Sequence, residues 1–317
     1  MFSGGSSRKS FFAAVFFIIC GLVCVDSAAA QSEAAWKKEL AAWRVDHAAD
    51  LQKPDGWLAL AGLVWLDAGD NSVGSGSDNK VKLPASAPAH VGVLHLEAAT
   101  VSLRPPSGGG GFPAGLLVDG KPATAGELHT SSDNDKGNPR MTIGPLNFYA
   151  VKRGERFALR IKDANSAARV GFKGLKWYPA NEHYRVTAKW IPYDPPKTIK
   201  LGTMIGTAYD APVPGAAEFQ LDGKTYRLEP VTEDKPPVKL FFILKDTTSA
   251  TKTYGACRFL YTALPPGGLD KAGELVLDFN HLENPPCAYT PFATCPLPPA
   301  GNRLKIALPV GELRYHE

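Results

Sequence analysis

The sequence predicts an all-β protein, an antiparallel barrel or sandwich, with one N-terminal helix after a cleaved signal peptide. Three observations support this fold class. One segment near the N-terminus has clear helical periodicity, and several later segments alternate apolar and polar residues with period two. With 31 glycines and 27 prolines among 317 residues, turns are frequent enough to separate many short strands.

The first 30 residues have the three-part pattern of a secretory signal peptide. Arg8 and Lys9 form the positive region, residues 11–25 are apolar, and small residues at 27–30 offer a cleavage site near Ala30. This apolar run is shorter than the roughly 20 residues that cross a bilayer. We therefore expect an exported protein, periplasmic or secreted, whose mature chain has no membrane span.

A helix is expected within residues 31–55. Trp36, Leu40 and Trp43 recur at spacings of four and three, which places them on one helical face. Pro54 ends the pattern, because proline lacks the backbone N–H that a helix interior requires. The tryptophan stripe is best explained as a face that packs onto protein.

The remainder of the chain, residues 56–317, is expected to form the β-rich domain. Residues 184–190 alternate apolar and polar side chains and predict a strand with one wet face. The pair Asp222–Gly223 predicts a hairpin, because both positions tolerate the positive φ of a tight turn. Two β subunits could divide near residues 192–196, where the sequence is PYDPP. Further strand candidates are 157–162, 238–244, 255–260, 275–279 and 304–308, and residues 67–79 are expected to form a polar loop.

Charge and motifs exclude several classes of function. The formal net charge is +4, and no run of Lys or Arg alternates with aromatic residues, so nucleic acid is not an expected partner. The glycine-rich residues 74–79 lack the Lys-Ser/Thr pair of a phosphate loop. No cofactor is therefore predicted.

Three cysteines follow the leader: Cys257, Cys287 and Cys295. An exported protein can form a disulfide, and with three cysteines at least one thiol remains unpaired within the chain. A bridge between Cys287 and Cys295 would close a short loop; the alternatives are reduced, buried thiols or a reactive or metal-binding cysteine. No metal site is predicted, since the spacing of this pair differs from that of a zinc knuckle and no histidine pair stands nearby.

Six prolines fall within residues 284–299 and restrict the backbone there. Because each proline removes a backbone donor, this segment cannot be a central strand. It is expected to run as a rigid extended coil. The coil would be either a structural cover over one end of the β domain or a pocket wall that holds Tyr289 and Phe292.

Several polar residues near predicted strand ends form the candidate site. Asp246, Arg258 and Asp278, together with Glu312, would by default make a buried ion network, because buried charges must be paired. Alternatively, Asp246 and Asp278 would act as a catalytic acid–base pair around Arg258. The candidate ligand-binding residues are Asn280, Asn284, Tyr254, Tyr289 and Phe292.

An ordered series of motifs runs from residue 246 to residue 312. The motifs are Asp246-Thr247-Thr248, Thr253-Tyr254, Arg258, Asp278-Phe279-Asn280, NPPC at 284–287, TCPLPP at 294–299, Asn302-Arg303-Leu304 and Gly311-Glu312. The series resembles the domain of unknown function 1684 family of bacterial and archaeal proteins, and GWLALAGLVWL at 56–66 is similar to that family's opening. Glu283 departs from the family pattern, which usually has an aromatic residue there. The resemblance implies no particular activity.

We expect the protein to bind a small polar or saccharide-like ligand, such as an envelope saccharide, at its C-terminal strand ends. The Asp, Asn and Arg side chains would orient the ligand, and the aromatic side chains would supply apolar walls. One alternative is a hydrolase that uses Asp246 and Asp278 around Arg258. The other is a structural envelope protein without a small-molecule site. These patterns do not decide whether the protein is an enzyme.

Overall fold

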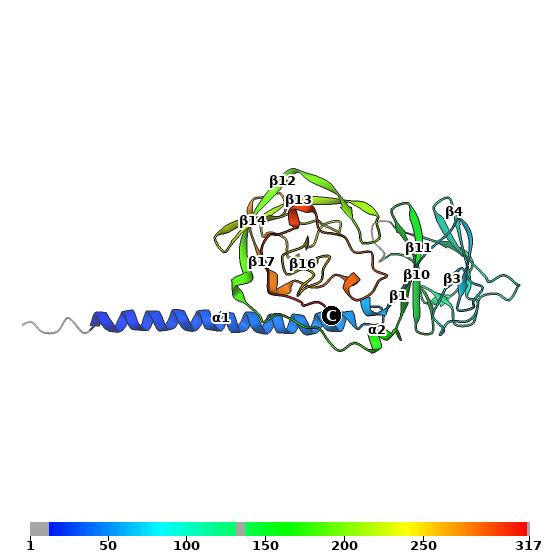
Figure 1. Ribbon diagram of the computed structural model, residues 1–317, viewed down its shortest axis with the longest axis horizontal. Coiled ribbons are helices and arrows are strands. Elements are labelled where there is room, and N and C mark those ends of the chain that lie inside the picture. The colour runs from blue at the N-terminus through cyan, green and yellow to red at the C-terminus, as the bar shows by residue number, and fades with distance from the viewer. Residues whose placement is uncertain (1–12, 131–136, 316–317) are drawn as a thin grey trace, which may run out of the picture. The chain divides into compact units, whose positions relative to one another are not determined.

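The computed structural model describes residues 13–130 and 137–315, and the chain divides into two compact units, Met1–Asp46 and His47–Glu317 (Figure 1). The predicted fold class is confirmed: the described residues form mostly β-strands, with one long helix near the N-terminus. The sheets of the described residues are open rather than closed into a barrel, so the architecture is sandwich-like.

The long helix is α1 (Ala13–Leu51), which includes the predicted helical segment and begins earlier than expected. Trp36 and Leu40 from the predicted apolar face are buried. Within the described part of the chain, no helix combines the length and apolar character that a membrane crossing needs. The predicted signal peptide falls on residues 1–12, outside the described residues, and on the start of α1, and it stays a prediction.

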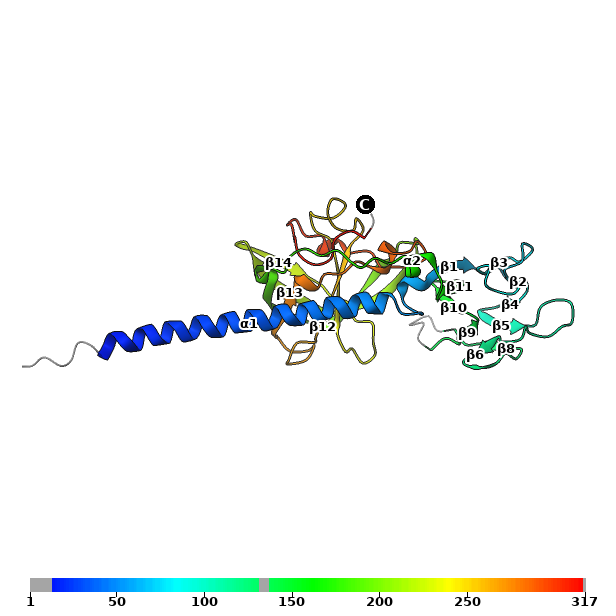
Figure 2. The same cartoon turned by 90° about the horizontal axis from the view of Figure 1, so that it is seen from below.

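Two sheets pack face to face in the first part of the second unit (blue to green in Figures 1 and 2). One has the strand order β1-β11-β10-β9-β6-β7 and the other β3-β2-β4-β5-β8. Apolar side chains from both sheets, including Leu94, Leu103, Phe148 and Leu159, share one core. The strands are β1 (Leu60–Trp65), β2 (Gly69–Gly74), β3 (Val81–Lys82), β4 (Gly92–Glu97), β5 (Thr100–Arg104), β6 (Leu117–Val118), β7 (Lys121–Pro122), β8 (Gly126–Leu128), β9 (Met141–Ile143), β10 (Leu146–Arg153) and β11 (Arg156–Asp163).

A four-stranded antiparallel sheet with the order β14-β13-β12-β17 follows, and β15 pairs with β16 in a separate ribbon. Trp190, Phe242, Leu277 and Phe279 are fully or almost fully buried in the core that these elements share. The strands are β12 (Arg185–Gly202), β13 (Ala208–Leu221), β14 (Lys224–Leu228), β15 (Leu240–Leu244), β16 (Arg258–Thr262) and β17 (Gly273–Asp278). The short helices are α2 (Ala167–Val170), η1 (Trp57–Ala59), η2 (Glu182–Tyr184), η3 (Phe279–His281), η4 (Pro286–Ala288) and η5 (Ala300–Asn302).

The predicted hairpin is confirmed. Asp222 and Gly223 have φ values of 51° and 71° and connect β13 to β14, whose register pairs Leu221 with Lys224. Both central positions therefore have the left-handed backbone that the Asp-Gly sequence predicts.

Three segments differ from the expected pattern. Residues 69–74, expected in a loop, form β2, because β4 supplies an antiparallel partner for every one of residues 69–73. Residues 304–308, expected as a strand, make only scattered backbone hydrogen bonds to residues 245–247. Residues 192–196 lie within β12, where the pairing with β13 shifts register because proline offers no N–H to the ladder.

The proline-rich segment 284–299 runs as coil around the single short helix η4, as predicted. Side-chain and backbone hydrogen bonds fix it to the strands. Thr290 donates its hydroxyl to the carbonyl of Leu60 at 3.0 Å, and the N–H of Leu297 donates to the carbonyl of Gly202 at 2.8 Å. These bonds fix the middle and the end of the coil to β1 and β12.

Candidate functional site

Asp246 and Arg258 form a buried ion pair. Asp246 follows β15, Arg258 begins β16, and their closest N–O distance is 2.6 Å, with both side chains shielded from solvent. Arg258 also donates to the carbonyls of Leu308 (2.9 Å) and Val310, and one Asp246 oxygen accepts the N–H of Thr248 at 2.7 Å. The pair therefore ties the β15–β16 ribbon to the C-terminal coil, residues 303–315.

Asp278 has a different set of partners. It ends β17, and its Oδ1 accepts two hydrogen bonds from Asn280, from the backbone N–H at 3.0 Å and from the amide at 2.8 Å. Its Oδ2 lies 3.4 Å from Nδ1 of His281 and 3.9 Å from Nε of Arg185. The structure thus places Asp246 with Arg258, and Asp278 with Asn280, in two separate groups of contacts.

The other candidate ligand-binding residues are held by internal contacts. Asn280 exchanges hydrogen bonds with the backbone N–H and carbonyl of Asn181, both at 2.9 Å. Tyr254 donates its hydroxyl to the carbonyl of Cys287 at 3.0 Å. Phe292 packs against the core cluster that contains Cys295.

Asn284 and Tyr289 lie together around the buried carboxylate of Glu312. Tyr289 donates its hydroxyl to Oε1 of Glu312 at 2.6 Å, and Asn284 donates its amide to the same oxygen at 2.7 Å and its backbone N–H to Oε2 at 2.8 Å. His47 approaches the cluster from the end of α1, with Nε2 at 3.5 Å from Oε2 of Glu312 and Nδ1 at 3.3 Å from Glu283. Two carboxyl groups and one imidazole therefore share a mostly buried site.

Burial sets the protonation of this acid cluster. Burial, together with the charge of Glu312, raises the pKa of Glu283 to about 7, against the lowering effect of His47. Burial opposes the charge of His47 as well, but its hydrogen bond to Glu312 and the charges of both carboxylates raise its pKa above the ordinary value. Glu283 is thus able to gain or lose a proton near neutral pH.

His47 is not among the site residues predicted from the sequence, although the sequence contains a signal for it. His47 is four residues after Trp43, and so extends the face that contains Trp36 and Leu40 by one more turn. A polar residue that continues an otherwise apolar helical face is a candidate for a buried partner.

Gly311 positions Glu312. Its φ is +79°, and a Cβ there would lie 2.6 Å from both the carbonyl oxygen and the Cβ of Leu282. This close approach allows the N–H of Glu312 to donate to the carbonyl of Leu282 at 2.8 Å. The carboxylate of Glu312 is thereby directed toward Asn284 and Tyr289.

Replacing Gly311 with alanine is expected to lower the free energy of unfolding by about 2 kcal/mol, through backbone strain at positive φ and overpacking. Gly301→Ala is the matched control, because its added Cβ would meet nothing within 4 Å and its φ is ordinary. Urea denaturation of both variants measures the difference. Equal stabilities would contradict the positioning role of Gly311.

The predicted Cys287–Cys295 disulfide is not formed in this structure. Cys257, Cys287 and Cys295 are free thiols. The sulfur of Cys295 accepts the backbone N–H of Cys287 at 3.1 Å, a contact of a thiol rather than of a bridge. The two residues are nevertheless adjacent, as the predicted bridge required.

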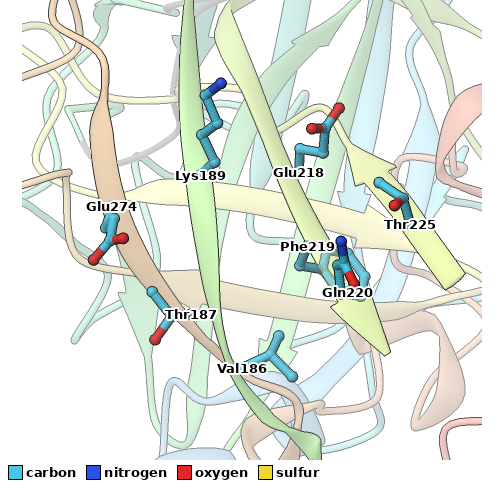
Figure 3. A pocket seen from close by; sticks show the side chains of 8 residues that line it. All are labelled: Val186, Thr187, Lys189, Glu218, Phe219, Gln220, Thr225 and Glu274. Carbon is cyan, nitrogen blue, oxygen red and sulfur yellow. The ribbon is translucent and has the colours of Figure 1, made fainter. Parts of the chain in front are cut away.

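Two open concavities lie along the β14-β13-β12-β17 sheet, and Thr187 and Glu274 line both. The larger, about 530 Å³, has lysine, glutamate, glutamine and threonine side chains spread over all four strands (Figure 3). The second, about 510 Å³, lies at the end of β17 and includes Asp278 and His281. Its remaining lining residues are Leu260, Tyr261, Thr262, Ala263, Leu264, Pro266, Leu275 and Val276.

No group of three or more His, Cys, Asp or Glu among residues 13–130 and 137–315 has a geometry that could hold a metal ion. The carboxylates of the candidate site are instead paired with arginine, histidine, tyrosine and amide donors.

Comparison with known proteins confirms the resemblance found in the sequence. Residues 170–313 match the model of the family described as "Protein of unknown function (DUF1684)". Among solved structures, an NMR structure of an uncharacterized protein of Haloarcula marismortui is 29% identical, covering 46% of this chain and 78% of that chain with a TM-score of 0.38. No curated protein matches the chain in sequence.

Proposed function

We propose that this chain, whose residues 170–313 match the DUF1684 family model, binds a small polar, saccharide-like ligand in the concavity at the end of β17. The observation that carries this proposal is the position of Asp278. Asp278 was predicted from the sequence as a site residue, and it lines this concavity. The volume of the concavity, about 510 Å³, is large enough for a small ligand.

The chemistry of the lining fits a sugar. Carboxylates of Asp278 and Glu274 can accept hydrogen bonds from ligand hydroxyl groups, and Thr187 can donate or accept. Three lining side chains can therefore exchange hydrogen bonds with the hydroxyl groups of a sugar.

The apolar part of the lining suits the C–H face of a saccharide ring. Val276 has 46% of its surface exposed on the open face of the sheet, although it is a β-branched apolar residue. Leu264 and Pro266 continue the apolar surface in the same concavity. A ligand with one apolar and one hydroxyl-bearing face would cover these residues while it keeps its polar groups paired.

Calorimetric titration with glucose, galactose, N-acetylglucosamine and their short oligomers tests the proposal. We expect heat of binding from at least one of these sugars. Glu274→Gln removes a charge-assisted hydrogen bond and Thr187→Val removes a neutral one, so each variant should lower the affinity by about tenfold. These side chains are exposed, so stability should stay unchanged. Glu127→Gln, an exposed glutamate on β8, is the matched control.

Absence of binding to every sugar of the panel would reject the saccharide proposal. Binding that is unaffected by both Glu274→Gln and Thr187→Val would reject this location for it.

A further inference from the structure

Two cysteines that are separated along the proline-rich coil meet in space. The backbone N–H of Cys287 donates to the sulfur of Cys295 at 3.1 Å. Cys257, just before β16, packs in the same core cluster, and its thiol lies 3.7 Å from the carbonyl of Pro296. Three thiols therefore gather at one end of the β15–β16 ribbon.

The two adjacent thiols are not equivalent. Cys287 is partly exposed, whereas Cys295 and Cys257 are buried. The hydrogen bond from Cys295 lowers the pKa of Cys287, while that bond and burial raise the pKa of Cys295. The more exposed cysteine is thus the one that gives up its proton more readily, and the buried cysteine keeps its proton.

The backbone holds this arrangement from both sides. Cys287 lies within η4, behind two consecutive prolines, and its carbonyl accepts the hydroxyl of Tyr254 at 3.0 Å. The carbonyl of Cys295 accepts the N–H of Met204 at 2.9 Å, next to another proline. Because proline restricts φ, the two sulfurs stay neighbours whether or not they are bonded.

We propose that Cys287 and Cys295 form a thiol–disulfide exchange site for a small organic disulfide, with Cys287 as the attacking sulfur and Cys295 as the resolving sulfur. These residues are separate from the concavity at the end of β17, so the proposal goes beyond ligand binding there. A small disulfide is the fitting substrate class, because Cys287 is only partly exposed among rigid prolines.

The reaction balances without another reactant. The Cys287 thiolate bonds to one sulfur of R–S–S–R, and the other sulfur leaves as RS⁻. The Cys295 thiol then loses its proton and attacks the Cys287 sulfur, which forms the Cys287–Cys295 bond and expels a second RS⁻. The protein loses two electrons and two protons, and R–S–S–R becomes two RSH.

The test equilibrates the full chain with glutathione and glutathione disulfide at varied ratios, then maps alkylated thiols by mass spectrometry. Mapping separates Cys20 and Cys24 of the predicted leader from the three cysteines of the site. We expect Cys287 and Cys295 to be oxidised together and reversibly, with a midpoint within the range of glutathione buffers, while Cys257 stays alkylatable after unfolding.

Variants assign the two roles. Cys295→Ala should accumulate one glutathionyl group on Cys287, because the resolving thiol is gone, and Cys287→Ala should accumulate none. Cys257→Ala is the control and should retain reversible pairing of the other two. If either variant fails to fold, thiol mapping of the unmutated chain still shows whether Cys287 and Cys295 are oxidised together and reversibly.

Two results would overturn the proposal. The pair could stay reduced at every glutathione ratio, which would make the thiols inert. Alternatively, an oxidised pair could resist reduced glutathione and dithiothreitol in the folded protein, which would make the bridge a purely structural one.

Discussion

Replacing Arg258 with alanine is expected to lower the free energy of unfolding by about 3–5 kcal/mol. The change would leave the buried carboxylate of Asp246 without its cation, and the carbonyls of Leu308 and Val310 without their donor. An unpaired charge in a dry interior costs more than the pair itself contributes. The C-terminal coil should therefore loosen first.

Urea denaturation at neutral pH measures this loss, with Arg303→Ala as the matched control, since Arg303 is exposed on the same C-terminal coil. Asp246→Asn should cost less than Arg258→Ala, because the amide keeps an oxygen that can accept the N–H of Thr248. A loss below about 1 kcal/mol for Arg258→Ala would be at odds with a buried, fully engaged pair.

Local sequence chemistry predicted the elements whose structure depends on near neighbours. The Asp222–Gly223 hairpin needs only two residues that tolerate positive φ, and both residues have positive φ in the structure. The coil at 284–299 needs only prolines, which cannot contribute to a ladder. In both cases the deciding interactions lie within a few residues along the chain.

The grouping of the candidate site depended on strand topology, which the alternation pattern does not contain. Asp246 follows the end of β15 and Asp278 ends β17, and positions at strand ends suggested a pairing between them. However, β15 belongs to a two-stranded ribbon and β17 to the four-stranded sheet. Strand ends of different sheets need not face one another, so the two carboxylates have different partners.

The acid cluster of His47, Glu283 and Glu312 could not be predicted from local sequence patterns either, because its residues are far apart along the chain. His47, Glu283 and Glu312 come from the end of a helix, a loop after η3 and the C-terminal coil. The local sequence around each residue does not show that the three side chains meet. Burial in one place brings them together, and burial of the Glu283 carboxyl group is what raises its pKa.

Stability is expected to fall as pH rises through this cluster. The pKa of Glu283 is raised by burial from 4.5 to about 7, so the folded state holds a proton that the unfolded chain releases above about pH 4.5. Stability is then lost between about pH 4.5 and 7, and the shift of roughly 2.5 pKa units corresponds to at most about 3 kcal/mol. The raised pKa of His47 acts in the same direction, because its contribution is complete below pH 6.5 and is lost as pH rises through its folded value.

Glu283→Gln isolates the contribution of the carboxyl group. Its backbone bonds to Phe259, at 2.9 and 3.0 Å, do not involve the side chain and remain. Glutamine resembles the protonated acid, so the variant should match the unmutated protein near pH 4 and exceed its free energy of unfolding by up to about 3 kcal/mol at pH 8. Denaturation across this pH range measures the gap, and Glu127→Gln, exposed on β8, should leave the profile unchanged. Parallel profiles for Glu283→Gln and the unmutated protein would mean that Glu283 is ionised throughout, with His47 as a charged partner that offsets its burial.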